Sequence, residues 1–171
     1  MLRTSLAVSL ALILAAPACN SKAAVDPAAQ AEELKRDLSN GAARVKDEKY
    51  AEAEAMFARV LAAEPENAEA LAGMGRVRLG TKKYPEALSL LERAAAKLPD
   101  DAALQASLGE AYVKLDRHGD AATAYAAAFK IDPANGNYGL AQAKALRQTK
   151  QLEKAEAVLR EVAKTDAQTE F

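Results

Sequence analysis

Residues 102–133 read AALQASLGEAYVKLDRHGDAATAYAAAFKIDP, and versions of this stretch recur at a fixed step along the 171-residue chain. The clearest markers are Pro65, Pro99 and Pro133, which are 34 residues apart and lie in the tails AAEPENA, AKLPDDA and KIDPANG. A fixed period of this length indicates stacked copies of one supersecondary unit. The rest of the sequence can therefore be compared with this stretch position by position.

The residue types in the stretch suit two short helices packed side by side. Such helices need small side chains where their axes come closest and bulky side chains beside that crossing. Pro133 follows the second helix, which it stops because proline lacks an N–H and has a fixed φ. The small and bulky positions are, in chain order, Leu108, Gly109, Tyr112, Ala121, Tyr125 and Ala128.

In this order and spacing, the residues resemble the tetratricopeptide repeat family, whose 34-residue unit is two antiparallel helices. The resemblance implies an all-α fold, a right-handed superhelical solenoid of about four helix-turn-helix repeats. It also implies a set of repeat-packing residues outside the quoted stretch, namely Tyr50, Ala53, Phe57, Pro65, Gly75, Tyr84, Ala87, Ala94, Pro99 and Ala155.

We expect the repeat domain to cover residues 27–167, with repeats at about 34–67, 68–101, 102–135 and 136–167 and a short tail at 168–171. Asp26-Pro27 is typical of a helix start, and this first helix should run to about Glu48. The first repeat matches poorly because Asn40-Gly41 replaces the Leu-Gly pair, and the fourth repeat lacks the closing proline. Both ends of the array are therefore expected to be atypical.

Composition excludes some classes of function. The formal net charge is −1, aromatic residues make up 5% and there is no tryptophan. Nucleic acid is an unsuitable partner, since the chain has neither a basic excess nor a supply of rings for stacking bases. The single cysteine excludes an internal disulfide and a cysteine-based metal site.

The N-terminus has the pattern of a bacterial export signal. Residues 1–18 combine Arg3, a short apolar run and the small-residue exit Ala16-Pro17-Ala18. Cys19 follows directly, so the segment resembles a lipobox, in which that thiol is acylated and residues 19–26 form a lipidated start and a flexible spacer. Ala16 departs from the usual Leu, which leaves cleavage by ordinary signal peptidase as the alternative. Asn20 favours an address in the outer membrane, facing the periplasm.

The family resemblance implies a binding groove on the concave side, lined by the first helix of each repeat. Small and apolar residues form most of the expected floor, with three cations and one carboxylate among them, which suits a protein segment of some acidic character. The alternative is that the charges are an ordinary solvated face. The positions are Leu38, Ala42, Val45, Ala72, Arg76, Leu79, Ala106, Glu110, Val113, Leu140, Lys144 and Arg147.

The carboxylate clamp of chaperone-binding members is absent from the matching positions Leu38, Ala42, Gly73, Ala103 and Ser107. Nothing in the sequence indicates an enzyme, a cofactor or a bound metal. The only histidine, His118, stands where other repeats have tyrosine, so packing or a turn contact is its expected role.

The sequence thus predicts a non-enzymatic scaffold for protein–protein interaction, tethered by lipid to the envelope and aiding the assembly of an envelope complex. Two alternatives remain. One is a soluble exported interaction module. The other is a structural subunit that self-associates through its last helix, where Leu152, Val158, Leu159 and Val162 cannot all be buried against the preceding helix.

Overall fold

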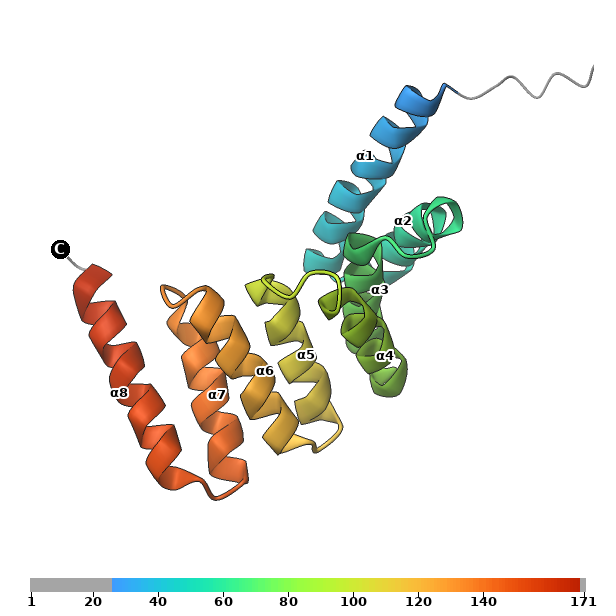
Figure 1. Ribbon diagram of the computed structural model, residues 1–171. Coiled ribbons are helices and arrows are strands. Elements are labelled where there is room, and N and C mark those ends of the chain that lie inside the picture. Colours follow the sequence, from blue (N-terminus) through green and yellow to red (C-terminus); the bar gives the residue numbers. More distant parts are fainter. Residues whose placement is uncertain (1–25, 170–171) are drawn as a thin grey trace, which may run out of the picture.

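The computed structural model describes residues 26–169, and within these it contains eight helices and no strand. The all-α expectation is confirmed, and the helices form a superhelical solenoid (Figure 1). The signal segment and Cys19 lie outside the described residues. The helices are α1 (Pro27–Lys46), α2 (Tyr50–Ala63), α3 (Ala68–Gly80), α4 (Tyr84–Ala95), α5 (Ala102–Lys114), α6 (His118–Ile131), α7 (Gly136–Gln148) and α8 (Leu152–Thr169).

Side-chain caps fix where the first helix of each pair begins. The Asp26 carboxylate accepts from the Ala28 N–H at 3.0 Å, and Pro27 occupies the first turn as the sequence predicts. Asn67 and Asp101 accept in the same way from N–H groups at the starts of α3 and α5. Because such caps satisfy N–H groups that have no partner inside the helix, they set the helix boundary.

The turn between the two helices of each pair contains a non-glycine residue with a left-handed backbone. These residues are Glu48, Lys82, Asp116 and Lys150, with φ between 57° and 62°. The next residue's N–H returns to a carbonyl five residues earlier, as Lys83 does to Arg78 at 2.8 Å. This is the Schellman ending of a helix, at a position where glycine is usual. The first helix therefore ends at Lys46, two residues before the predicted limit.

Large residues of the second helices pack over small residues of the first helices. The Phe57 ring lies against both Gly41 of α1 and Gly73 of α3, and Tyr125 covers Gly109. The alanines expected at the helix crossings are buried, including Ala53, Ala87, Ala94, Ala121, Ala128 and Ala155. The prolines Pro65, Pro99 and Pro133 are exposed and follow the ends of α2, α4 and α6.

The two ends of the stack differ from its middle. Residues 27–33 of α1 are exposed, and this end of the helix stands clear of the other helices in Figure 1. At the other end, α8 runs from Leu152 to Thr169.

One buried carboxylate is held by an arginine on the neighbouring helix. Asp37 of α1 is 6% exposed and accepts two hydrogen bonds from Arg59 of α2, at 2.7 and 2.6 Å. The hydrogen bonds from Arg59 keep the pKa of Asp37 below its ordinary value of 3.8. Protonation of Asp37 therefore weakens the contact between α1 and α2.

A pH dependence of stability follows from this pair. Because the folded pKa is lowered, the contribution of Asp37 is complete above pH 3.8 and is lost as the pH falls through the lower folded value. We expect the free energy of unfolding, measured by urea titration between pH 6 and pH 2.5, to fall less steeply with acid in Asp37→Asn than in the parent. The control is Asp100→Asn, because Asp100 is exposed. Equal acid slopes in the parent and in Asp37→Asn would contradict the assignment.

Candidate peptide-binding groove

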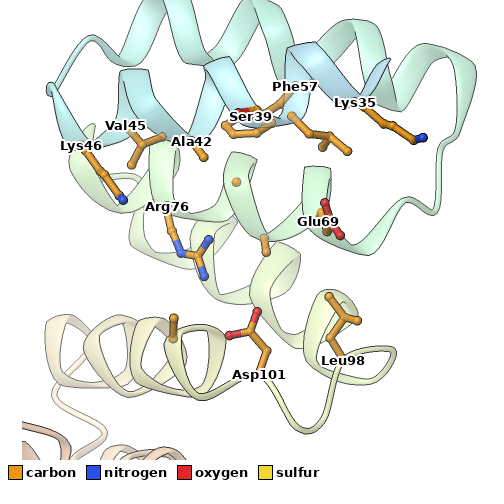
Figure 2. A pocket seen from close by; sticks show the side chains of 14 residues that line it. Lys35, Ser39, Ala42, Val45, Lys46, Phe57, Glu69, Arg76, Leu98 and Asp101 are labelled. Carbon is orange, nitrogen blue, oxygen red and sulfur yellow. The ribbon is translucent and has the colours of Figure 1, made fainter. Parts of the chain in front are cut away.

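A hollow of about 550 Å³ lies between α1, α3 and the start of α5 (Figure 2). It is formed where the first helices of three successive pairs lie side by side, as the repeat pattern predicts. The walls bring together residues far apart in the chain. They are Lys35, Leu38, Ser39, Ala42, Val45, Lys46, Phe57, Glu69, Ala72, Gly73, Arg76, Leu98, Asp101 and Ala103.

The floor of the hollow is apolar. Leu38, Ala42 and Val45 come from one side of α1, and Ala72 and Gly73 come from α3. The ring of Phe57, which comes from α2, lies between these two helices and borders the hollow. An apolar floor of this kind favours the side chains of an amphipathic or extended segment.

Arg76 is the one positive charge within the hollow that is partly buried. Its Nε donates to the Ser107 hydroxyl at 3.0 Å, and Ser107 in turn donates to the Ala103 carbonyl at 2.8 Å. Burial lowers the pKa of the Arg76 guanidinium, an effect that the nearby Asp101 and Tyr138 oppose. Since an arginine pKa is far above neutrality, the group stays charged.

The other partly buried arginines of residues 26–169 are held by carboxylates. Arg78 pairs with Glu54 at 2.8 Å and with Glu86 at 3.0 Å, and Arg44 pairs with Glu52 at 3.0 Å. Arg76 makes no such pair within the described part of the chain, although Asp101 lies across the hollow from it (Figure 2). The Asp101 carboxylate already accepts from the Leu104 N–H at 2.9 Å.

A second hollow, of about 380 Å³, continues from the first and shares Val45 and Arg76 with it. Glu110 and Lys114 of α5 provide its charges on one side, and Lys82 provides another. The ring of Tyr50 lies over Gly80 in its wall. Arg76 therefore stands where the two hollows meet.

The structure brings together about half of the predicted groove residues. Leu38, Ala42, Val45, Ala72 and Arg76 line the first hollow, and the second adds Leu79 and Glu110, although Ala72 and Leu79 are largely buried. The other predicted groove residues line neither of these two hollows, and their place in a groove along all four repeats stays a prediction. These are Ala106, Val113, Leu140, Lys144 and Arg147.

Sequence reasoning missed several residues of the hollow. The sequence predicts only a packing role for Phe57, whose side chain also lines the hollow. The family pattern gives Gly73 a place only in the clamp, yet its lack of a side chain leaves room for the Phe57 ring. The same pattern gives no role to Lys35 and Lys46, which lie at the two ends of the α1 wall.

The single histidine lies away from both hollows, at the start of α6. Its Nε2 is 3.8 Å from an oxygen of Asp116, and its Nδ1 is buried without a hydrogen-bond partner among residues 26–169. Within the same residues, no three His, Cys, Asp or Glu side chains gather closely enough to hold a metal ion. None of the described helices has both the length and the apolar composition to cross a membrane.

A family model described as tetratricopeptide repeat matches the chain at residues 44–111 and 78–144. No curated protein matches the sequence. The two matches to the family model together cover most of the helices that form the two hollows.

Solved structures of the same shape include MamA proteins. The structure of MamA AMB-1 is 25% identical, with 78% of this chain and 73% of that chain covered and a TM-score of 0.65. A MamA fragment from Desulfovibrio magneticus RS-1 is 24% identical over 79% of this chain and 76% of that one, with a TM-score of 0.69. A mutant of an O-GlcNAc transferase from Thermobaculum terrenum is 27% identical over 68% of this chain but only 22% of that chain, with a TM-score of 0.64.

Proposed function

Because this chain belongs to the tetratricopeptide repeat family, we propose that it works as an adaptor that binds a segment of a partner protein in the hollow between α1, α3 and α5. Protein–protein interaction on a helical scaffold is the function of the fold; the finer proposal is a periplasm-facing adaptor, tethered to the outer membrane, that aids assembly of an envelope complex. The proposal includes no catalytic step.

The observation that carries the groove assignment is the unpaired charge of Arg76 above an apolar floor. A guanidinium with little water around it gains most from a carboxylate that arrives with a ligand, because such a charge-assisted hydrogen bond is strong away from bulk solvent. The adjacent floor of Leu38, Val45 and Phe57 accepts apolar side chains of the same segment. The proposed ligand is therefore an apolar segment with a Glu or Asp placed to meet Arg76.

Synthetic peptides test this specificity. Fluorescence anisotropy would compare an apolar peptide carrying one Glu with the same peptide carrying Gln or Lys. Reversing the charge by Arg76→Glu should weaken binding of the Glu peptide by about tenfold or more, since a charge-assisted hydrogen bond is worth about 1.5–3 kcal/mol. It should also shift the preference toward the Lys peptide.

The matched control is Arg147→Glu, which makes the same charge change at an exposed residue of α7 that lines neither hollow. Binding by this variant should equal that of the parent. If Arg76→Glu leaves the preference among the three peptides unchanged, or if both variants weaken binding equally, the groove assignment is wrong.

The proposed membrane tether depends on Cys19, which is the first residue after the expected cleavage site. Two or three acyl chains hold a protein to a bilayer far more firmly than one. Intact mass analysis of the protein made in a bacterial host should show the mass of an acylated Cys19, and Cys19→Ser should release the chain from the membrane fraction. An unmodified N-terminus at Cys19 would support the soluble exported module instead.

A further inference from the structure

The outer face of α8 carries an exposed apolar stripe. Leu152 is 63% exposed and Leu159 is 39% exposed, and Ala163 is also exposed. Residues at steps of seven and four along a helix lie on the same side, so these three form one line. The buried contacts of α8 come from other positions, Ala155 and Val162.

The equivalent residues of the earlier repeats, at steps of 34, indicate that this stripe is a helix-packing surface. One, two and three repeats before Leu159 stand Tyr125, Leu91 and Phe57, of which Leu91 is 0% and Phe57 2% exposed. Phe57 is covered because α3, the first helix of the following pair, lies on it through Gly73. Among residues 26–169 no first helix of a further pair packs on Leu159, so this position stays exposed there.

The charges beside the stripe are ordered along the helix. Glu153 and Glu156 come first along the helix, and Arg160 and Lys164 follow them, all exposed and all on the same flank of the stripe. Glu156 and Arg160 pair within the helix at 2.6 Å, where both side chains keep more than half of their exposure. A second α8 laid antiparallel would bring Glu153 and Glu156 of each helix toward Arg160 and Lys164 of the other.

The opposite end of the stack, at α1, has no comparable apolar stripe among the positions compared below. Positions 70, 74 and 77 of α3, which face α2, hold Ala70, Met74 and Val77, all buried. One repeat earlier, the same positions of α1 are Arg36, Asn40 and Ala43, all exposed. The outer face of α1 is therefore largely polar, as expected of a terminal cap.

We propose that a second copy of this chain covers the α8 stripe, with the two α8 helices antiparallel about a two-fold axis. Leu152 of one copy then packs beside Ala163 of the other, the two Leu159 side chains lie near the axis, and the flanking acids lie near the flanking bases. Because the same surface is used on both copies, the association closes at a dimer rather than growing into a filament. The hollow between α1, α3 and α5 stays open in each of the two copies, so this inference does not depend on the proposed peptide site.

Analytical ultracentrifugation at several protein concentrations tests the proposal. The protein would be kept reduced and in a non-ionic detergent, so that neither a Cys19 disulfide nor a lipid drives association. We expect a monomer–dimer equilibrium that stops at twice the chain mass. Leu159→Glu should raise the dissociation constant at least about tenfold, since it places a charge at the centre of the contact.

Charge variants distinguish the antiparallel pairing from any other contact. The first variant combines Glu153→Arg with Glu156→Arg, and the second combines Arg160→Glu with Lys164→Glu. Each variant alone should be monomeric, because like charges would then face each other across the contact. Mixed in equal amounts, they should form a heterodimer. The control is Lys154→Glu, which lies nearly opposite the stripe on the same helix and should dimerise like the parent.

Circular dichroism would confirm that each variant keeps its helices. The proposal is overturned if the parent stays monomeric at the highest concentration, if its mass grows beyond a dimer, or if the mixed charge variants fail to associate. Peptide binding by Arg76→Glu is read in a separate assay, so failure of one proposal leaves the other intact.

Discussion

Replacing Phe57 by alanine is expected to lower the free energy of unfolding by about 4 kcal/mol, since truncating a buried phenylalanine typically costs about 3–5 kcal/mol. Phe57 is 2% exposed and its ring fills the space between Gly41 and Gly73, so truncation leaves a cavity bordered by α1, α2 and α3. Two glycines already line that space, so few side-chain atoms are available to move in. Urea titration followed by circular dichroism would measure the loss.

The control for this prediction is Leu140→Ala, because Leu140 is 49% exposed. It should change the free energy of unfolding by less than about 1 kcal/mol. A loss at Leu140 equal to that at Phe57 would show that the ring does not hold the three helices together. Because the ring also forms part of the groove floor, Phe57→Ala should weaken peptide binding under conditions where the chain is still folded.

The second large effect is expected at Gly73, where alanine should destabilise the chain even though it favours a helix. A Cβ built at Gly73 would lie 2.2 Å from the nearest atom of the Phe57 ring, so either the ring or α3 must move. Overpacking of this kind typically costs about 1–3 kcal/mol, more than the gain of about 1 kcal/mol from replacing a helical glycine.

Gly119 provides the matched comparison. It is also in a helix, α6, but a Cβ there would meet nothing within 4 Å, so Gly119→Ala should be neutral or slightly stabilising. The double variant Phe57→Ala with Gly73→Ala should be less damaged than the sum of the single variants, because the alanine partly fills the space the ring leaves. Strict additivity would show that the two residues do not share this contact.

The helix pattern was predictable from the sequence because it depends on short-range signals that repeat. Prolines after the second helices, Asp26-Pro27 at the first start, and small residues at crossings each have a local physical cause. The family pattern also predicts Arg76 on the concave side, because the first helix of each repeat faces the same side of a solenoid. In the structure Arg76 lines both hollows.

Other features depend on contacts between repeats and could not be predicted from one repeat at a time. The hollow ends near α5, so Leu140, Lys144 and Arg147 of α7 lie outside it. The importance of Phe57 depends on glycine occurring on both helices that it touches, one in its own repeat and one in the next. The predictions for the signal segment and Cys19 concern residues outside the described range and stay predictions.

The left-handed turns were missed for a different reason. Their residues are Glu48, Lys82, Asp116 and Lys150, whereas glycine is the usual signal for that backbone. The hydrogen bonds of the two flanking helices impose the conformation, so it is visible only when the four positions are compared in the folded chain.

These turns also determine how such a chain can gain or lose length during evolution. Each falls at the same point of the period, so a deletion of residues 82–115 would join Thr81 to Asp116 and remove one unit of 34 residues. One left-handed residue would take the place of another, and α3 would be followed by α6 through an unchanged type of turn. Duplication between two such points would lengthen the array in the same way, with no new connection needed.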